Sequence, residues 1–112
     1  MTSPDSPTPD DAPEASTEHD RLTVVDRPDA GRYELHLDGE RVGLADYSIR
    51  DGVITIPHVE TDPQHRGKNF AARLMAGALD DIRERGMTVR PLCPYAAAYM
   101  QRHPDTQDLV AG

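Results

Sequence analysis

The stretch between residues 62 and 71, DPQHRGKNFA, has the residue types of an anion-binding turn. Gly67 allows the backbone to approach a ligand closely, and the cations Arg66 and Lys68 flank it. The residues that follow predict a helix, whose first turn presents unpaired N–H groups and a partial positive charge. Together these features predict a site for a phosphate or pyrophosphate group. The alternative is an ordinary strand-to-helix loop with Arg-Gly-Lys on its surface.

The turn is expected to lie between a central strand and a long helix. Residues 53–60, VITIPHVE, are apolar on both faces, as in a strand that is covered on both sides. Pro57 cannot donate a backbone hydrogen bond, so we expect a bulge or a splayed edge there. Residues 66–85 predict a helix, because apolar side chains recur at spacings of three and four before Gly86. Its polar face is expected to carry Arg73, Gly77, Asp80, Asp81 and Glu84.

Further strands are expected before and after these two elements. Alternating apolar residues and the Asp-Gly pairs at 38–39 and 51–52 predict consecutive antiparallel hairpins. The other expected elements are strands at 22–25, 33–37, 42–49 and 87–92, and a short helix at 95–102. The order strand, helix, strand implies a right-handed crossover and parallel pairing. The predicted fold class is mixed α/β (α+β): four antiparallel strands, a helix, a parallel fifth strand and a short C-terminal helix.

The charge of the chain is concentrated at its N-terminal end. Of the formal net charge of −8, residues 1–20 contribute six acids and no Lys or Arg, together with four prolines. We expect a disordered, acidic, Pro-rich tail over residues 1–20, either regulatory or merely solubilising, followed by one domain over residues 21–112. That domain carries 14 acids against 12 bases. A nearly neutral body with few aromatic residues and no Trp argues against a nucleic-acid partner.

The sequence also bears on compartment and membrane contact. It has no apolar run of about 18 residues and no basic-then-apolar N-terminal stretch, so we expect neither a membrane span nor a secretory signal. Cys93 is the only cysteine, which excludes an internal disulfide. A cytoplasmic location follows as an expectation. We identify no candidate metal ligands.

These motifs in this order resemble the GNAT superfamily of N-acetyltransferases. Gln64 and Gly67 match the first two fixed positions of its acetyl-CoA motif, Q/R-x-x-G-x-G/A, whereas Asn69 stands where the family has Gly or Ala. Asn adopts left-handed dihedral angles more readily than most residues. The resemblance covers residues 21 to about 105 and is closest to a minimal single-domain branch of about 90–100 residues. Its other marks are PHVE at 57–60, PLCPY at 91–95 and HP at 103–104.

The resemblance implies an acetyl-CoA-dependent transferase that acts on an amine. It implies that the fourth and fifth strands splay apart and that the pantetheine arm enters the gap between them. Backbone groups of residues 59–61 would pair with this arm, and the amides of residues 64–70 would hold the pyrophosphate. The implied cofactor-binding residues are Val59, Glu60, Thr61, Gln64, His65, Arg66, Gly67, Lys68, Asn69, Phe70 and Ala71. The implied partners are acetyl-CoA, as a small-molecule acyl donor, and an amine acceptor that the sequence does not identify.

Acetyl transfer needs a neutral amine, a stabilised carbonyl oxygen and a protonated leaving thiolate. Glu60, beside the implied thioester, is a candidate general base, and His58 on the same face is another. Cys93, across the gap, is a buried hydrophobe, a covalent acetyl acceptor or a partner in a mixed disulfide with CoA. Tyr95 and Tyr99 share a helix face. The resemblance implies a helix tyrosine near the cofactor sulfur as general acid, and we choose Tyr99 for this role; the alternative is that both tyrosines are core residues.

Two classes of function remain open at this point. The first is the N-acetyltransferase, which the joint presence of Glu60, Cys93 and Tyr99 favours. The second is a non-catalytic CoA-binding sensor or interaction module, because a domain of this size has few elements from which to build an acceptor pocket.

Overall fold

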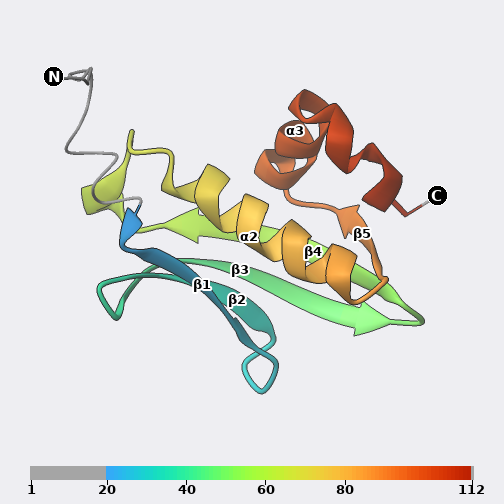
Figure 1. The fold of residues 1–112 in the computed structure, drawn as a ribbon, viewed down its shortest axis with the longest axis horizontal. Coiled ribbons are helices and arrows are strands. Elements are labelled where there is room, and N and C mark those ends of the chain that lie inside the picture. The colour runs from blue at the N-terminus through green and yellow to red at the C-terminus, as the bar shows by residue number, and fades with distance from the viewer. Residues whose placement is uncertain (1–19, 112) are drawn as a thin grey trace, which may run out of the picture.

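The computed structural model of this chain describes residues 20–111 (Figure 1). The strands are β1 (Leu22–Arg27), β2 (Arg32–Leu37), β3 (Glu40–Arg50), β4 (Val53–Thr61) and β5 (Thr88–Pro91). The helices are α2 (Phe70–Glu84) and α3 (Pro94–Arg102), with short 3₁₀ helices η1 (Pro63–His65) and η2 (Pro104–Leu109). Residues 1–19 of the expected tail lie outside the described residues. Within residues 20–111, no helix is both long enough and apolar enough to cross a membrane.

The five strands form one sheet in the order β1-β2-β3-β4-β5. The first three pairs are antiparallel and the β4–β5 pair is parallel, which confirms the predicted fold class. Both Asp-Gly pairs make the expected tight turns, with positive φ at Asp38, Gly39, Asp51 and Gly52. Helix α2 crosses one face of the sheet between β4 and β5 (Figure 1).

A β-bulge interrupts β4 at Pro57. In the register with β3, Asp46 pairs with His58 but Ser48 pairs with Thr55, so β4 carries one residue more than β3 over this interval. The predicted bulge is confirmed, and its cause is the missing N–H of proline. The pairing of β4 with β5 also stops here, at Ile56, while β4 continues to Thr61. All four residues of β5 pair with β4, and β5 ends at Pro91, so the edge of β4 beyond Ile56 has no partner in β5.

The bulge changes which face of the sheet each side chain of β4 occupies. Before it, Ile54 and Ile56 are fully buried, while after it Val59 packs against the same core. His58 and Glu60 lie on the opposite face and are exposed. We call this opposite face the open face; on it Glu60 stands beside Leu44 in the strand register.

Helix α2 begins at Phe70, not at residue 66 as expected. Asn69, directly before it, has φ 61° and ψ 27°, a left-handed conformation that cannot continue a right-handed helix. The expected apolar face is confirmed: the buried residues of α2 are Phe70, Leu74, Met75, Ala78, Leu79 and Ile82. The bounds of the other expected elements differ from the observed ones by at most two residues.

The assignment of Gly77 to the polar face of the helix is wrong. A Cβ atom on Gly77 would stand 2.4 Å from Cγ2 of Val24 in β1. The helix therefore contacts β1 closely at this residue, and glycine is needed there for space. Sequence periodicity missed the contact because glycine has no side chain whose polarity would mark its face.

The C-terminal end of α2 is attached to the sheet by polar contacts. The hydroxyl of Tyr33 donates to Asp81 of the helix at 2.6 Å, and Arg85 pairs with both Asp81 and Asp26. The hydroxyl of Tyr47 donates to Asp26 at 2.6 Å, and burial, together with this bond, raises the pKa of Tyr47 to about 12. These contacts fix the helix axis on the sheet, and with it the position of the turn at the other end of the helix.

The open face contains one buried carboxylate, Glu34 of β2. His36 Nε2 and Arg32 Nε each lie 2.8 Å from its oxygens, and Arg27 and Arg41 lie within 4 Å. The hydrogen bond with His36, followed by that with Arg32, lowers the pKa of Glu34 to about 2, although burial opposes the shift. The ionised carboxylate thus holds cationic side chains from three strands together.

We predict that Glu34→Gln destabilises the protein in a pH-dependent way. Because the pKa of Glu34 is lower in the folded than in the unfolded chain, its contribution is complete above about pH 4.5 and is lost as the pH falls toward 2. At pH 7 the variant should lose about 1–3 kcal/mol of unfolding free energy, as for a hydrogen bond to a charged group. Urea unfolding at several pH values measures this difference.

The matched control is Asp38→Asn, which removes an exposed carboxylate paired with Arg21 at 2.9 Å. Asn tolerates the left-handed backbone of this position, so its effect should stay within about 0.5 kcal/mol. A loss for Glu34→Gln that is equal at pH 7 and pH 2 would show that packing, not charge, is responsible.

Candidate functional site

The turn between β4 and α2 is shaped by its own hydrogen bonds and by two left-handed residues. Asp62 accepts from the backbone N–H groups of Gln64, at 3.0 Å to its side chain, and of His65, at 2.9 Å to its carbonyl oxygen. Gly67 has φ 81° and Asn69 has φ 61°. The chain therefore folds back tightly and enters α2 with the first N–H groups of the helix directed toward the turn.

Asn69 occupies the place where the acetyl-CoA motif has Gly or Ala. Its left-handed conformation gives a physical reason for the small or permissive residue at this position. Asn is among the few side chains that adopt this conformation at modest cost. The departure from the motif therefore leaves the shape of the turn intact.

The turn forms one wall of a pocket of about 190 Å³. The pocket is lined by Thr61, His65, Arg66, Gly67, Asn69, Phe70, Ala71 and Tyr95. All of these except Tyr95 are among the predicted cofactor-binding residues, and none is a carboxylate. Lys68 stands next to the pocket, with Nζ 3.4 Å from Nδ1 of His65 and 5.8 Å from the centre of the Phe70 ring. The pocket is thus lined by a cationic side chain and by the first residues of helix α2.

The backbone of β4 beyond the bulge offers an edge for pairing. The N–H of Asp62 donates to the carbonyl of Val42 at 2.8 Å, so these two residues form a hydrogen-bonded antiparallel pair. Hydrogen-bonded pairs alternate along such a ladder, which makes Glu60 and Leu44 the next one. The backbone groups of Val59 and Thr61 therefore point away from β3, toward the side that β5 has left. An extended ligand chain can pair with them there.

Cys93 lies at the closed end of this gap. Its N–H donates to the carbonyl of Ile56 at 2.9 Å, directly at the last β4–β5 pair. The side chain is a free, buried thiol, 7% exposed, at the residue before α3. Cys93 is therefore across from Ile56. The sequence analysis expected it across the gap from Glu60, which lies four residues farther along β4.

His58 and Glu60 are brought together on the open face. His58 Nε2 lies 2.6 Å from Oε1 of Glu60, and the two side chains are 52% and 58% exposed. Both belong to a different side of the sheet from the pocket at the turn. Glu60 also lines a second pocket, of about 270 Å³, between the ends of β3 and β4.

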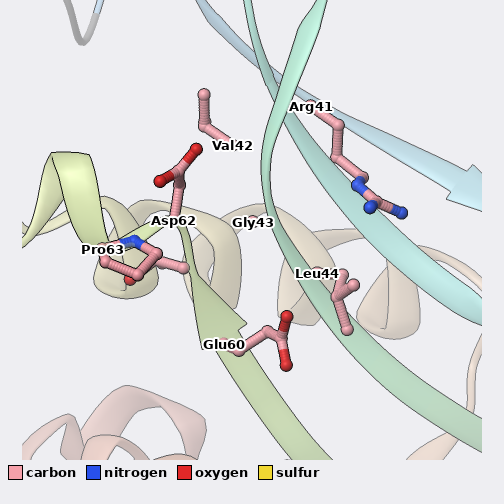
Figure 2. Close-up of a pocket in the computed structure, with 8 residues that line it drawn as sticks. Arg41, Val42, Gly43, Leu44, Glu60, Asp62 and Pro63 are labelled. Carbon is pink, nitrogen blue, oxygen red and sulfur yellow. The ribbon is translucent and has the colours of Figure 1, made fainter.

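Figure 2 shows this second pocket, with the side chains of Glu60 and Leu44 next to each other and Asp62 and Pro63 at its far end. Arg41, Val42 and Gly43 of β3 line it as well. Sequence reasoning did not identify the β3 side of this pocket. The alternation of β3 alone could not identify it, because the register that places Leu44 opposite Glu60 depends on the bulge.

The two tyrosines of α3 lie in different places. Tyr95 lines the pocket at the turn, whereas Tyr99 lines a separate pocket of about 100 Å³ between α2 and η2. The Tyr99 ring stacks on His103 with centroids 3.9 Å apart. Of the two, Tyr95 at the start of the helix lines the pocket at the turn and Tyr99 does not, whereas the role predicted for Tyr99 concerns the thioester and stays a prediction. Helical spacing placed both on one face but could not tell which end of the helix meets the turn.

Comparison with known proteins places this geometry in a family. Residues 32–109 match the family profile described as GCN5-related N-acetyl-transferase. No curated protein matches the sequence significantly. Several solved structures share the fold.

The ribosomal-protein-S18-alanine N-acetyltransferase of Escherichia coli has a TM-score of 0.55 and 16% identity over 80% of this chain and 56% of its own. A GCN5-like protein of Staphylococcus aureus has a TM-score of 0.60 and 16% identity, covering 82% and 90%. N-acetylglutamate synthase of Neisseria gonorrhoeae, solved with coenzyme A and N-acetyl-glutamate, has a TM-score of 0.53 and 16% identity over 85% and 26%. This chain thus spans little more than half of the Escherichia coli enzyme and most of the Staphylococcus aureus protein. The profile match covers most of the chain, and the chain belongs to the GCN5-related N-acetyltransferase family.

Proposed function

We propose that this protein is an N-acetyltransferase that moves an acetyl group from acetyl-CoA to an amine. The observation that carries the proposal is the turn at Gly67 and Asn69, which opens a cationic pocket beside the unpaired edge of β4. A pyrophosphate fits there because the lining holds Arg66 and His65 but no Asp or Glu. Such a site suits an acyl carrier with a phosphate group at one end.

The remainder of the carrier has a path along β4. An extended pantetheine arm can pair with the backbone of Val59 and Thr61, as an added strand does with a sheet edge. Its thioester then arrives at the closed end of the gap, near Ile56 and Cys93. The synthase from Neisseria gonorrhoeae, which shares the fold, is known with coenzyme A bound, and this supports a CoA-derived donor.

The residues near the closed end supply the groups that acetyl transfer requires. The amine nitrogen bonds to the thioester carbon, the carbon–sulfur bond breaks, and one proton moves from nitrogen to a base while the thiolate gains one. His58 and Glu60 are the candidate bases. Burial raises the pKa of both Tyr95 and Tyr99, so either hydroxyl stays protonated and able to donate. We choose Tyr95 as the candidate acid because it follows Cys93 by two residues at the start of α3, and Tyr99 is the alternative.

The first prediction concerns the turn. Gly67→Val should weaken acetyl-CoA binding at least about tenfold, because a branched side chain disfavours the left-handed backbone that aims the amides, and each charge-assisted bond contributes about 1.5–3 kcal/mol. Titration calorimetry measures the affinity. Gly52→Val is the matched control: its φ is 78°, its added side chain also meets open space, and it lies at the far end of β4. Equal acetyl-CoA affinity in folded Gly67→Val protein would refute the phosphate-binding role.

The second prediction concerns the choice between the tyrosines. Tyr95→Phe should lower kcat about 10²-fold or more with little change in acetyl-CoA affinity, as for loss of a general acid. Tyr99→Phe removes the same hydroxyl one helical turn away and should leave kcat within a factor of two or so. Steady-state release of free CoA with a panel of amines gives both values. The reverse ranking of the two variants would return the role to Tyr99.

The third prediction concerns Cys93. We infer direct transfer from thioester to amine, so Cys93→Ala should retain most of its activity and acetyl-CoA affinity. Because the thiol is buried, the substitution should lower the unfolding free energy by roughly 1–2 kcal/mol. Cys93→Ser tests the same point with nearly unchanged volume.

Intact mass measurement after incubation with acetyl-CoA decides the matter. A hydroxylamine-labile acetyl group on Cys93, formed as fast as turnover, would show a covalent intermediate instead. Binding of acetyl-CoA without CoA release for any amine would favour the non-catalytic sensor or interaction module.

A further inference from the structure

We propose that His58 is the group that accepts the proton of the amine and that Glu60 is a positioning residue acting through it. The proposal rests on the proposed acetyl transfer. The sequence analysis named His58 and Glu60 as alternative bases, whereas here each residue has a role of its own. It is carried by the contact between the two side chains and by their places along β4.

The contact orients the imidazole ring. His58 Nε2 and Oε1 of Glu60 are 2.6 Å apart, so the carboxylate accepts the Nε2 proton. In a neutral imidazole with hydrogen on Nε2, the lone pair is on Nδ1, and that nitrogen is the acceptor. Both side chains are about half exposed, so the pair contributes little to stability as a surface ion pair.

The position along β4 favours His58 over Glu60. The gap closes at Ile56, whose carbonyl holds the N–H of Cys93. At roughly 3.3 Å per residue, the backbone of His58 lies about 7 Å from this point and that of Glu60 about 13 Å. His58 is therefore the nearer of the two along the strand to a thioester at the closed end, and the Glu60 carboxylate contacts the side of the imidazole that carries Nε2.

The two faces of the sheet separate donor from acceptor. The pocket at the turn includes Phe70 and Ala71 of α2 and lies on the helix side. His58 and Glu60 lie on the open face, because the Pro57 bulge turns them there. An amine that approaches from the open face meets His58 before it reaches the thioester in the gap.

Other charged groups also face this pair. Asp46 of β3 stands opposite His58 in the register, and Arg32 of β2 stands opposite Asp46. On β5, Arg90 pairs with Thr55 on the same side of the sheet. Asp46 is a carboxylate next to His58 on a neighbouring strand, and it serves as the control for a general effect of negative charge.

Each proton that moves in this reaction has a donor and an acceptor among the residues described above and water. As the nitrogen–carbon bond forms, the amine proton passes to Nδ1 of His58, and the ionised Glu60 stabilises the imidazolium. The carbon–sulfur bond breaks, and the thiolate takes a proton from Tyr95 or from water. Neutral His58 and the tyrosine hydroxyl are restored by exchange with solvent.

A double-mutant cycle tests the proposal. The variants are His58→Ala, Glu60→Gln, the double variant and the control Asp46→Asn, assayed for amine-dependent CoA release and, separately, for acetyl-CoA affinity by calorimetry. We expect His58→Ala to lower kcat about 10²-fold or more and Glu60→Gln about tenfold. The double variant should be no slower than His58→Ala, since Glu60 acts only through the imidazole. Acetyl-CoA affinity and the urea midpoint should not change, and Asp46→Asn should match the unaltered protein.

Three other outcomes would each refute a specific part of the proposal. An equal kcat loss from Glu60→Gln in the presence and absence of His58 would show that Glu60 acts directly. Unchanged kcat in either single variant would reduce the contact to a surface pair. If the unaltered protein binds acetyl-CoA but releases no CoA with any amine, the proposed function fails and this proposal with it; in the first two cases the function stands.

Discussion

The site depends on the single break in the central strand at Pro57. Proline cannot donate to the ladder, and β4 accommodates it with one extra residue. Because side chains alternate with a period of two, one extra residue exchanges the faces of everything beyond it. Without the bulge His58 and Glu60 would lie under α2 and Val59 would face outward. The pairing with β5 ends at the same point, because β5 itself ends at Pro91. The bulge and the end of β5 together therefore leave the gap beside the polar residues of the open face.

The other half of the site depends on where α2 begins and how firmly its far end is held. Gly77 allows the helix to approach Val24, and Tyr33 and Arg85 attach its last turns to the sheet through Asp81 and Asp26. With the helix fixed at that end, the left-handed residues before Phe70 determine where its first N–H groups point. The turn is thus positioned by contacts on the opposite side of the domain, which sequence motifs within the turn do not reveal.

Sequence reasoning recovered features that depend on local pattern. The strands, the Asp-Gly turns, the buried face of α2 and the bulge follow from periodicity and from the chemistry of glycine and proline. It failed where a three-dimensional register decides. The helix start was placed four residues early, since Arg66 and Lys68 fit a helical pattern and only the dihedral angles of Gly67 and Asn69 exclude it. Which of Tyr95 and Tyr99 lines the pocket at the turn is likewise decided by packing, and helical spacing alone does not show it.

The open face suggests how a small domain can leave one side of its sheet for an acceptor. A sheet face without a covering helix exposes backbone and apolar side chains unless other groups cover it. Here Glu34 holds Arg27, Arg32, His36 and Arg41 on the β1–β3 side of the face, so that the charges of the arginines are paired with a buried carboxylate. This cluster ends at β3, and the strip between β3 and β4 carries Leu44, His58 and Glu60. The polar cluster therefore stabilises the face on one side and leaves the strip next to the gap accessible, where an amine can meet His58.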